Sequence, residues 1–152
     1  MEIQFRLGWV KSGKPAHKAF KLPAAHALML EYVGRISKFD PCQISNAITP
    51  EERKRPGTKI WICDRNQGAQ ALSSKALAGK LEKFRDSGMR ELVIAIGGPD
   101  GFSKEELERL KPDLKWSFGP MTLPHELAAV VAAEQIYRAW TIMRRTPYHL
   151  GH

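Results

Sequence analysis

An uninterrupted apolar run over residues 92–96, Leu-Val-Ile-Ala-Ile, limits the folds open to this chain more than any other segment. A strand that is apolar at every position is buried on both faces, which is typical of the centre of a parallel sheet covered by helices. The glycine-rich residues 97–101 follow at once and predict a sharp turn. Because parallel strands need helical crossovers, the run predicts an α/β fold with this strand at its centre.

Other segments alternate between strand and helix patterns in the same way. Strands are predicted over residues 3–7, 42–48, 60–63 and 114–118. Helices are predicted over residues 23–38, from a Ser73 or Ser74 cap to Gly88, over 103–110 with a capping box, and from Pro124 to about 144. Residues 11–21 and 49–58 are predicted to be loops. No internal repeat interrupts this alternation, so we expect a single parallel-sheet α/β/α domain over residues 1–152.

The apolar spacing also predicts which sides of the two longest helices face the core. In the first, the inner face is predicted to consist of Leu28, Met29, Tyr32, Val33 and Ile36. In the last, the predicted apolar surface consists of Leu127, Val130, Val131, Ile136, Tyr137 and Trp140.

The charge balance points to a polyanionic partner. The chain has 24 Lys and Arg against 16 Asp and Glu, a net charge of +8. Such an excess favours RNA or DNA phosphates, although a basic protein that is merely soluble would have the same composition. Two cysteines are too few for a disulfide framework, and five histidines lack metal-ligand spacing, so no metal site is expected. With neither a signal peptide nor a long apolar span, the expected location is the cytoplasm, away from membranes.

The glycine turn after the apolar run is the first candidate for a binding site. Glycines at the carboxyl end of a parallel strand let a ligand approach the backbone, and open α/β sheets bind ligands at such ends. Gly97 is the first of these glycines. The pattern is not the dinucleotide fingerprint GxGxxG, and a simple strand-to-helix turn is the alternative.

A compact loop before the last helix is the second candidate. Gly119 and Pro120 constrain the loop, while Met121 and Leu123 offer apolar contacts suited to an adenine ring. Thr122 is expected to cap the helix that follows, with a ligand hydrogen bond as the alternative.

The third candidate is the mixture of cations and aromatic rings between residues 138 and 149. Arg138, Arg144, Tyr148 and His149 belong to it. Such side chains contact phosphates and stack on bases. A packed amphipathic helix with a solvated end explains the same pattern equally well.

In this order, the motifs IGGPDG, FGPMTLPH and EQIYRAW followed by PYH resemble the RlmH-type family of ribosomal large-subunit pseudouridine N3-methyltransferases. These are SPOUT enzymes, the class with a trefoil knot. The resemblance is specific over residues 60–149 and weaker over residues 1–9 and around Glu31. It implies a deep knot over about residues 90–149 and a homodimer with the last helix in its interface.

The resemblance also implies a cofactor, a substrate and a reaction. The cofactor is S-adenosyl-L-methionine, held by three loops that contribute Cys63, Gly97, Phe118, Gly119, Pro120, Met121, Thr122 and Leu123. The substrate is a pseudouridine of 23S ribosomal RNA, met in the assembled ribosome. The enzyme aligns the activated methyl group with N3 and removes the N3 proton. Tyr148 and His149 are the candidates for this proton transfer, and Arg138 for an oxyanion or phosphate contact, or else for a solvated cation or a dimer salt bridge.

Three departures from the family pattern leave two alternatives open. Ala129 stands where the family has a basic residue, Leu150 stands where a cation follows the Tyr-His pair, and residues 42–60 lack an expected helix. The alternatives are a non-catalytic ribosome- or RNA-binding relative and a knotted methyltransferase with another RNA target.

Overall fold

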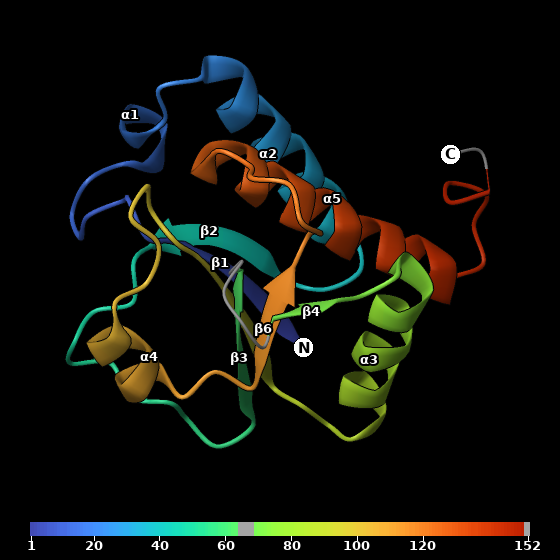
Figure 1. Ribbon diagram of the computed structural model, residues 1–152. Helices are drawn as coiled ribbons and strands as arrows, with labels where there is room; N and C mark the ends of the chain where they lie inside the picture. Colours follow the sequence, from blue (N-terminus) through green and yellow to red (C-terminus); the bar gives the residue numbers. More distant parts are fainter. Residues whose placement is uncertain (64–68, 151–152) are drawn as a thin grey trace.

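A six-stranded sheet is the centre of the computed structural model, which describes residues 1–63 and 69–150 (Figure 1). Within these residues the strand order is β2-β1-β5-β3-β6-β4, and every neighbouring pair is parallel. The strands are β1 (Glu2–Leu7), β2 (Cys42–Asn46), β3 (Thr58–Cys63), β4 (Gln70–Ala71), β5 (Glu91–Ile96) and β6 (Leu114–Ser117). The all-parallel sheet confirms the predicted fold class.

Strand β5 is central, as its apolar sequence predicts. It pairs with β1 on one side and with β3 on the other, and its residues 92–96 are all buried. In this register Ile96 lies beside both Leu7 and Cys63. The carboxyl ends of the three central strands therefore lie at the same edge of the sheet, and the loops that follow them begin side by side.

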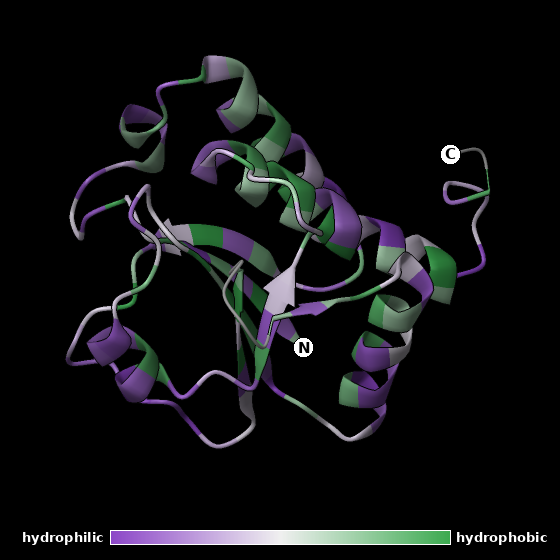
Figure 2. Ribbon diagram, viewed as in Figure 1, coloured by the Kyte–Doolittle hydropathy of each residue, from purple (hydrophilic) through white to green (hydrophobic). Residues whose placement is uncertain are grey.

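Helices cover the sheet in two unequal layers (Figure 1). The helices are α1 (Ala16–Ala19), α2 (Pro23–Ile36), α3 (Ser74–Asp86), α4 (Lys104–Leu110) and α5 (His125–Met143). Helices α2, α3 and α5 pack together over one face, where they share a core with the inward side chains of β1 and β5. On the other face, Leu107 of α4, Phe102 before it and Ile48 cover a smaller cluster around Ile62 and Val93. In Figure 2 the central strands are strongly hydrophobic, whereas α4 is mostly hydrophilic.

The predicted helix signals are present at two helix starts. Ser73 caps α3 by accepting a hydrogen bond from the N–H of Ala76 at 3.0 Å. Ser103 and Glu106 form the complete capping box of α4. These signals act within one turn of chain, so the sequence alone is enough to place them.

The inward faces of the two longest helices differ from the prediction. In α5 the fully buried positions include Ala129, Ala132, Ala133 and Ala139, whereas Leu127 is 40% exposed. Small side chains let α5 approach its neighbours closely, so alanine rather than leucine marks the buried face. In α2 the buried residues are Ala25, Met29 and Ile36, and Leu28 is 44% exposed. Leu28 and Leu127 were therefore wrongly placed in the core.

Two short elements were missed. Strand β4 has only two residues, both exposed, and pairs with β6 at the edge of the sheet. Helix α1 interrupts the predicted loop over residues 11–21, beginning after Pro15, whose φ of −69° suits a helix start. Neither segment has enough apolar periodicity to be recognised in a sequence.

The position of β6 shows how the chain is threaded. Strands β3 and β4 are consecutive in the chain, yet β6 lies between them and hydrogen-bonds to both. A strand from the C-terminal part of the chain is thus inserted into a gap left by an earlier segment. The chain then returns through residues 118–124 to α5 on the face that α2 and α3 cover.

Candidate functional site

A pocket of about 690 Å³ lies at the edge where the central strands end. Three segments line most of it: Cys63 at the end of β3, the glycine turn after β5, and the loop between β6 and α5. Open parallel sheets bind ligands at the carboxyl ends of their strands, and this volume suits a small molecule. The pocket therefore lies where the first and second sequence candidates meet.

The glycine turn presents backbone to this pocket. The N–H of Gly101 donates to the carbonyl of Gly98 at 2.9 Å, and the φ of Gly101 is +71°. Gly8 lies against the same strand end, since a Cβ there would be 2.9 Å from the carbonyl oxygen of Ile96. A side chain is excluded at Gly8 by this contact and disfavoured at Gly101 by its positive φ. The backbone of the glycine turn therefore forms one wall of the pocket.

The loop after β6 is held by its own hydrogen bonds. The Ser117 hydroxyl accepts from the N–H of Gly119 at 3.1 Å, and Gly119 adopts a φ of +104°. The Phe118 ring packs edge-on against Trp116, with centroids 4.8 Å apart. Met121 belongs to the same loop, lines the pocket and is 75% exposed.

Thr122 does not have the capping role expected for it. The N-cap of α5 is Pro124, which provides no side-chain hydrogen bond to the helix. Thr122 instead lines the pocket. The capping prediction was wrong because α5 begins at His125, two residues later than a threonine cap at position 122 would require.

The structure brings together most of the residues expected to hold the cofactor. Those that line the pocket are Cys63, Gly97, Phe118, Gly119, Met121, Thr122 and Leu123. Pro120 is in the same loop but not in the lining. The pocket also includes Asp100, Phe102 and His125, which the sequence analysis did not assign to it. Their positions in the sequence could have predicted this, because Asp100 and Phe102 lie in or next to the glycine turn and His125 follows Pro124. Cofactor binding by the eight residues named from the sequence stays a prediction.

The three residues expected near the reaction form a second cluster at the other end of α5. Arg138 donates to Oε1 of Glu134 from both Nε and Nη2, at 3.0 and 2.6 Å. The Tyr148 hydroxyl donates to the same oxygen at 3.1 Å, and the Arg138 guanidinium lies 4.9 Å from the Tyr148 ring centroid. Arg138 Nη1 is 3.2 Å from Nδ1 of His149. Glu134 thus joins Arg138 and Tyr148 through one carboxylate oxygen. The sequence analysis did not single out this residue.

The protonation of this cluster follows from its contacts. Burial, hydrogen bonding with Tyr32 and the negative charge of Glu134 raise the pKa of Tyr148 above its ordinary value of 10. Tyr148 therefore stays protonated at neutral pH and acts as a hydrogen-bond donor. Because a guanidinium only donates, His149 accepts from Arg138 at Nδ1.

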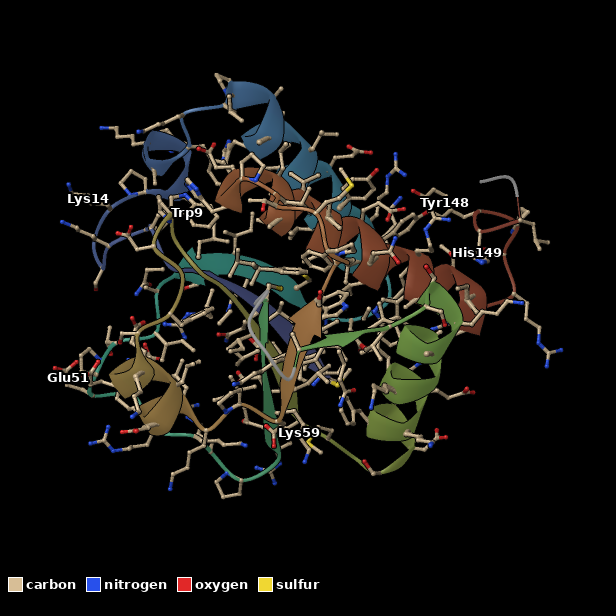
Figure 3. The ribbon with its side chains drawn as sticks, viewed as in Figure 1. Trp9, Lys14, Glu51, Lys59, Tyr148 and His149 are labelled. Carbon is tan, nitrogen blue, oxygen red and sulfur yellow. The ribbon has the colours of Figure 1, made fainter. Side chains whose placement is uncertain are left out.

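Within one chain the pocket and the cluster are far apart. None of Arg138, Tyr148 and His149 lines the pocket. Thirteen helical residues separate His125 from Arg138, which corresponds to about 20 Å along α5. In Figure 3, Tyr148 and His149 lie on the opposite side of the molecule from Trp9, whose ring centroid is 4.5 Å from that of His125.

Two further features of the described residues bear on the chemistry. Residues 1–63 and 69–150 contain no group of three or more His, Cys, Asp or Glu arranged to hold a metal ion. Across the same residues, no helix has the length and apolar character needed to cross a membrane.

A parallel sheet whose late strand is inserted between two earlier ones, with a ligand pocket at that edge, defines a class of knotted α/β proteins. The family model described as "Predicted SPOUT methyltransferase" matches residues 18–149. The chain therefore belongs to the SPOUT methyltransferase family, and membership implies a trefoil knot.

Relatives identify the branch of this family that the chain resembles. The protein named "Ribosomal RNA large subunit methyltransferase H" from Koribacter versatilis is 36% identical over 157 residues, covering 99% of this chain and all of the relative. Its namesake from Magnetococcus marinus is 33% identical, covering 96% of this chain and 98% of the relative. With the namesake from Maricaulis maris the identity is 46% over 94 residues, but this match spans only 58% of the relative and 62% of this chain. The family resemblance seen in the sequence is confirmed.

Proposed function

We propose that this chain is an S-adenosyl-L-methionine-dependent methyltransferase that transfers a methyl group to N3 of a pseudouridine in 23S ribosomal RNA. The observation that carries the proposal is the pocket, which the three predicted loops form at the threaded edge of a SPOUT family sheet. The names of the full-length relatives support ribosomal RNA as the substrate class.

The residues of the pocket fit this cofactor. Phe118, Met121 and Leu123 offer apolar surface to an adenine ring, and backbone of the glycine turn is accessible to polar atoms. Asp100 is the one carboxylate among the described residues of the lining, and it offers a negative charge to a cationic ligand. When bound, the cofactor supplies a methyl group already activated by its positive sulfur.

The C-terminal cluster supplies groups suited to the substrate base. N3 of pseudouridine loses a proton as it attacks the methyl group, and the resulting negative charge is stabilised by a nearby cation. Arg138 provides this cation, oriented by its two hydrogen bonds to Glu134. Tyr148 stays protonated and provides a hydrogen-bond donor rather than a base. His149 is the remaining candidate for accepting the proton, at Nδ1 once the substrate replaces His149 as the hydrogen-bond partner of Arg138 Nη1.

A homodimer would unite the two halves of the site. Because about 20 Å of α5 separates the pocket from the cluster in one chain, we propose that the cluster of one protomer meets the pocket of its partner. Leu127 on α5 and Leu28 on α2 leave apolar surface exposed on the helical face, which such an interface would cover. In this proposal the chain is one domain with its knot within about residues 90–149, and it works in the cytoplasm on the assembled ribosome.

The departure at Ala129 does not weaken this proposal. Ala129 is fully buried on the inner face of α5, so its side chain is not part of an RNA-binding surface in this chain. Leu150, in contrast, is 88% exposed beside the Tyr-His pair. The loss of a cation at this position is the departure that bears on RNA contact.

The test has two measurements. Calorimetric titration with S-adenosyl-L-methionine should show binding, and incubation with ribosomes lacking this methylation should add one methyl group to a 23S pseudouridine, located by mass spectrometry. No binding at millimolar cofactor would reject the enzyme. Cofactor binding without methylation of 23S RNA would instead favour a methyltransferase with another RNA target.

A further inference from the structure

Residues 9–22, here called the lysine segment, connect β1 to α2, and both ends are fixed to the start of α5. At one end, the Trp9 ring lies edge-on to His125, with centroids 4.5 Å apart. At the other, the carboxylate of Glu126 accepts hydrogen bonds from the backbone N–H groups of Lys21 and Leu22, at 3.2 and 2.9 Å. Since His125 lines the pocket, the segment is held at the pocket's edge.

A row of aromatic rings supports the lysine segment from beneath. Trp9 contacts Phe20 at 5.6 Å between centroids, and Phe20 contacts His26 at 5.1 Å. His26 in turn lies 6.4 Å from the exposed His17 of α1. Phe20 is only 8% exposed, so the rings act as internal support. The segment is therefore a shaped surface rather than an unsupported loop.

The lysine segment carries positive charge that the protein does not neutralise. Lys11, Lys14, Lys18 and Lys21 are all exposed, and none forms an ion pair with any residue in 1–63 or 69–150. Outside the segment, Lys54 and Lys59 share Asp113, and the other lysines likewise form no ion pair with a described residue. The segment is distinguished by its four unpaired lysines between residues 11 and 21, beside the pocket. Figure 3 shows Lys14 projecting outward on the side of the molecule where Trp9 lies.

The carboxylate that contacts the backbone of the segment is buried and occupied. Glu126 is 3% exposed, and its oxygens accept from the backbone of the segment. It therefore orders the segment while leaving the outward positive field of the lysines in place.

We infer that the lysine segment binds the phosphates of the RNA substrate and guides the strand to the methyl-donor pocket; this inference rests on the proposed function. Lysine ammonium groups spread along a loop suit the repeated charges of a phosphodiester chain. Binding to a membrane surface is favoured by a basic helix with an apolar face, and α1, with four residues and none of them buried, is too short to form one.

The experiment compares two variants with equal loss of charge. In the first, Lys11, Lys14, Lys18 and Lys21 are each replaced by Gln. In the control, four other exposed lysines are replaced by Gln: Lys38, Lys75, Lys83 and Lys111. The affinity for fluorescently labelled 23S RNA is measured from 50 to 200 mM KCl, together with calorimetric affinity for S-adenosyl-L-methionine.

Log affinity decreases with log salt, and in the first variant we expect the steepness of this decrease to be smaller than in the wild type by about 3. The control should change the slope by less than about 1, and cofactor affinity should be unchanged in both. Equal slopes in the two variants, with cofactor binding intact, would overturn the inference and leave the proposed function standing. Wild-type protein that binds neither RNA nor cofactor would overturn both. Loss of binding to phosphatidylserine vesicles, with RNA affinity unchanged, would assign the segment to lipid and also overturn it.

Discussion

Gly97 and Gly101 approach each other so closely across the turn after β5 that a Cβ on Gly97 would lie 3.1 Å from the Gly101 Cα. The same Cβ would lie 3.2 Å from the Phe102 ring. Two of the obstructing atoms belong to backbone, which cannot move without reshaping the turn. A side chain at Gly97 would thus disturb the pocket wall from within, rather than by direct contact with a ligand.

We therefore expect Gly97→Val to weaken S-adenosyl-L-methionine binding by about 10- to 100-fold, since overpacking costs about 1–3 kcal/mol. Calorimetric titration measures this loss. Gly79→Ala is the matched control, because a Cβ at this position within α3 meets nothing within 4 Å. It should keep full cofactor affinity and raise stability by about 0.5–1 kcal/mol. Full affinity in a folded Gly97→Val protein would show that the turn is not part of the binding site.

Both halves of this pocket could be predicted because their signals are local. An apolar strand followed by glycines identifies a strand end, and parallel strand ends share one edge of the sheet. The inner face of α5 could not be predicted in this way. From the sequence pattern, the larger apolar side chain of Leu127 is predicted to be buried in preference to Ala129. Close packing between helices instead favours the smaller side chain at the buried position. This preference becomes visible only in the arrangement of α2, α3 and α5.

The roles of the polar residues Glu126 and Glu134 could not be predicted from the sequence either. From sequence, Glu126 is an acidic residue in the first turn of a helix, a position that the helix dipole favours. Its partners lie more than 100 positions earlier in the chain. Glu134 likewise needs the return of residues 148–149 to α5 before it contacts Tyr148. Side-chain roles that depend on long-range contacts have no signal in a single sequence.

The C-terminal cluster can be tested at its centre. We expect Glu134→Gln to reduce the rate of methyl transfer by about 10- to 100-fold, because Arg138 loses the charged oxygen that accepts both of its hydrogen bonds. Cofactor affinity should be unchanged, since Glu134 does not line the pocket. Single-turnover kinetics and calorimetry separate the two effects.

Glu31→Gln is the control for this variant. Glu31 and Arg35 form an equivalent ion pair four residues apart, but their side chains are 56% and 39% exposed. An exposed pair of this kind contributes little, so the rate should be unchanged. Equal rates for Glu134→Gln and wild type would remove the cluster from the mechanism.

The Arg6–Glu52 pair gives a prediction about stability and pH. Arg6 is 8% exposed, and its guanidinium donates to both carboxylate oxygens of Glu52 at 2.8 and 2.6 Å. Hydrogen bonding by Arg6 lowers the pKa of Glu52 from 4.5 to about 2. Because the folded pKa is depressed, the stabilisation is complete above about pH 4.5 and is lost as the pH falls toward 2.

We expect Glu52→Gln to lower the free energy of unfolding by about 1–2 kcal/mol at pH 7, less than for a fully buried pair because Glu52 is 40% exposed. Urea unfolding should show the difference from wild type shrinking between pH 4.5 and pH 2. The neighbouring exposed Glu51, changed to Gln, should be neutral at both ends of this range. A difference that grows at acid pH would contradict the assignment of the ion pair.

Mixing two inactive variants tests whether the site is shared between protomers. With the cofactor kept well below the dissociation constant of the Gly97→Val protein, this substitution disables the pocket, and Arg138→Ala disables the cluster, each in its own chain. If one protomer's cluster serves its partner's pocket, half of the randomly mixed dimers pair the variants, and each such dimer has one of its two sites intact. Co-refolding an equal mixture should then restore about a quarter of wild-type activity, whereas each variant alone stays inactive. If both halves of a site came from the same chain, every site in the mixed dimer would carry one of the defects, and the mixture would stay inactive as well.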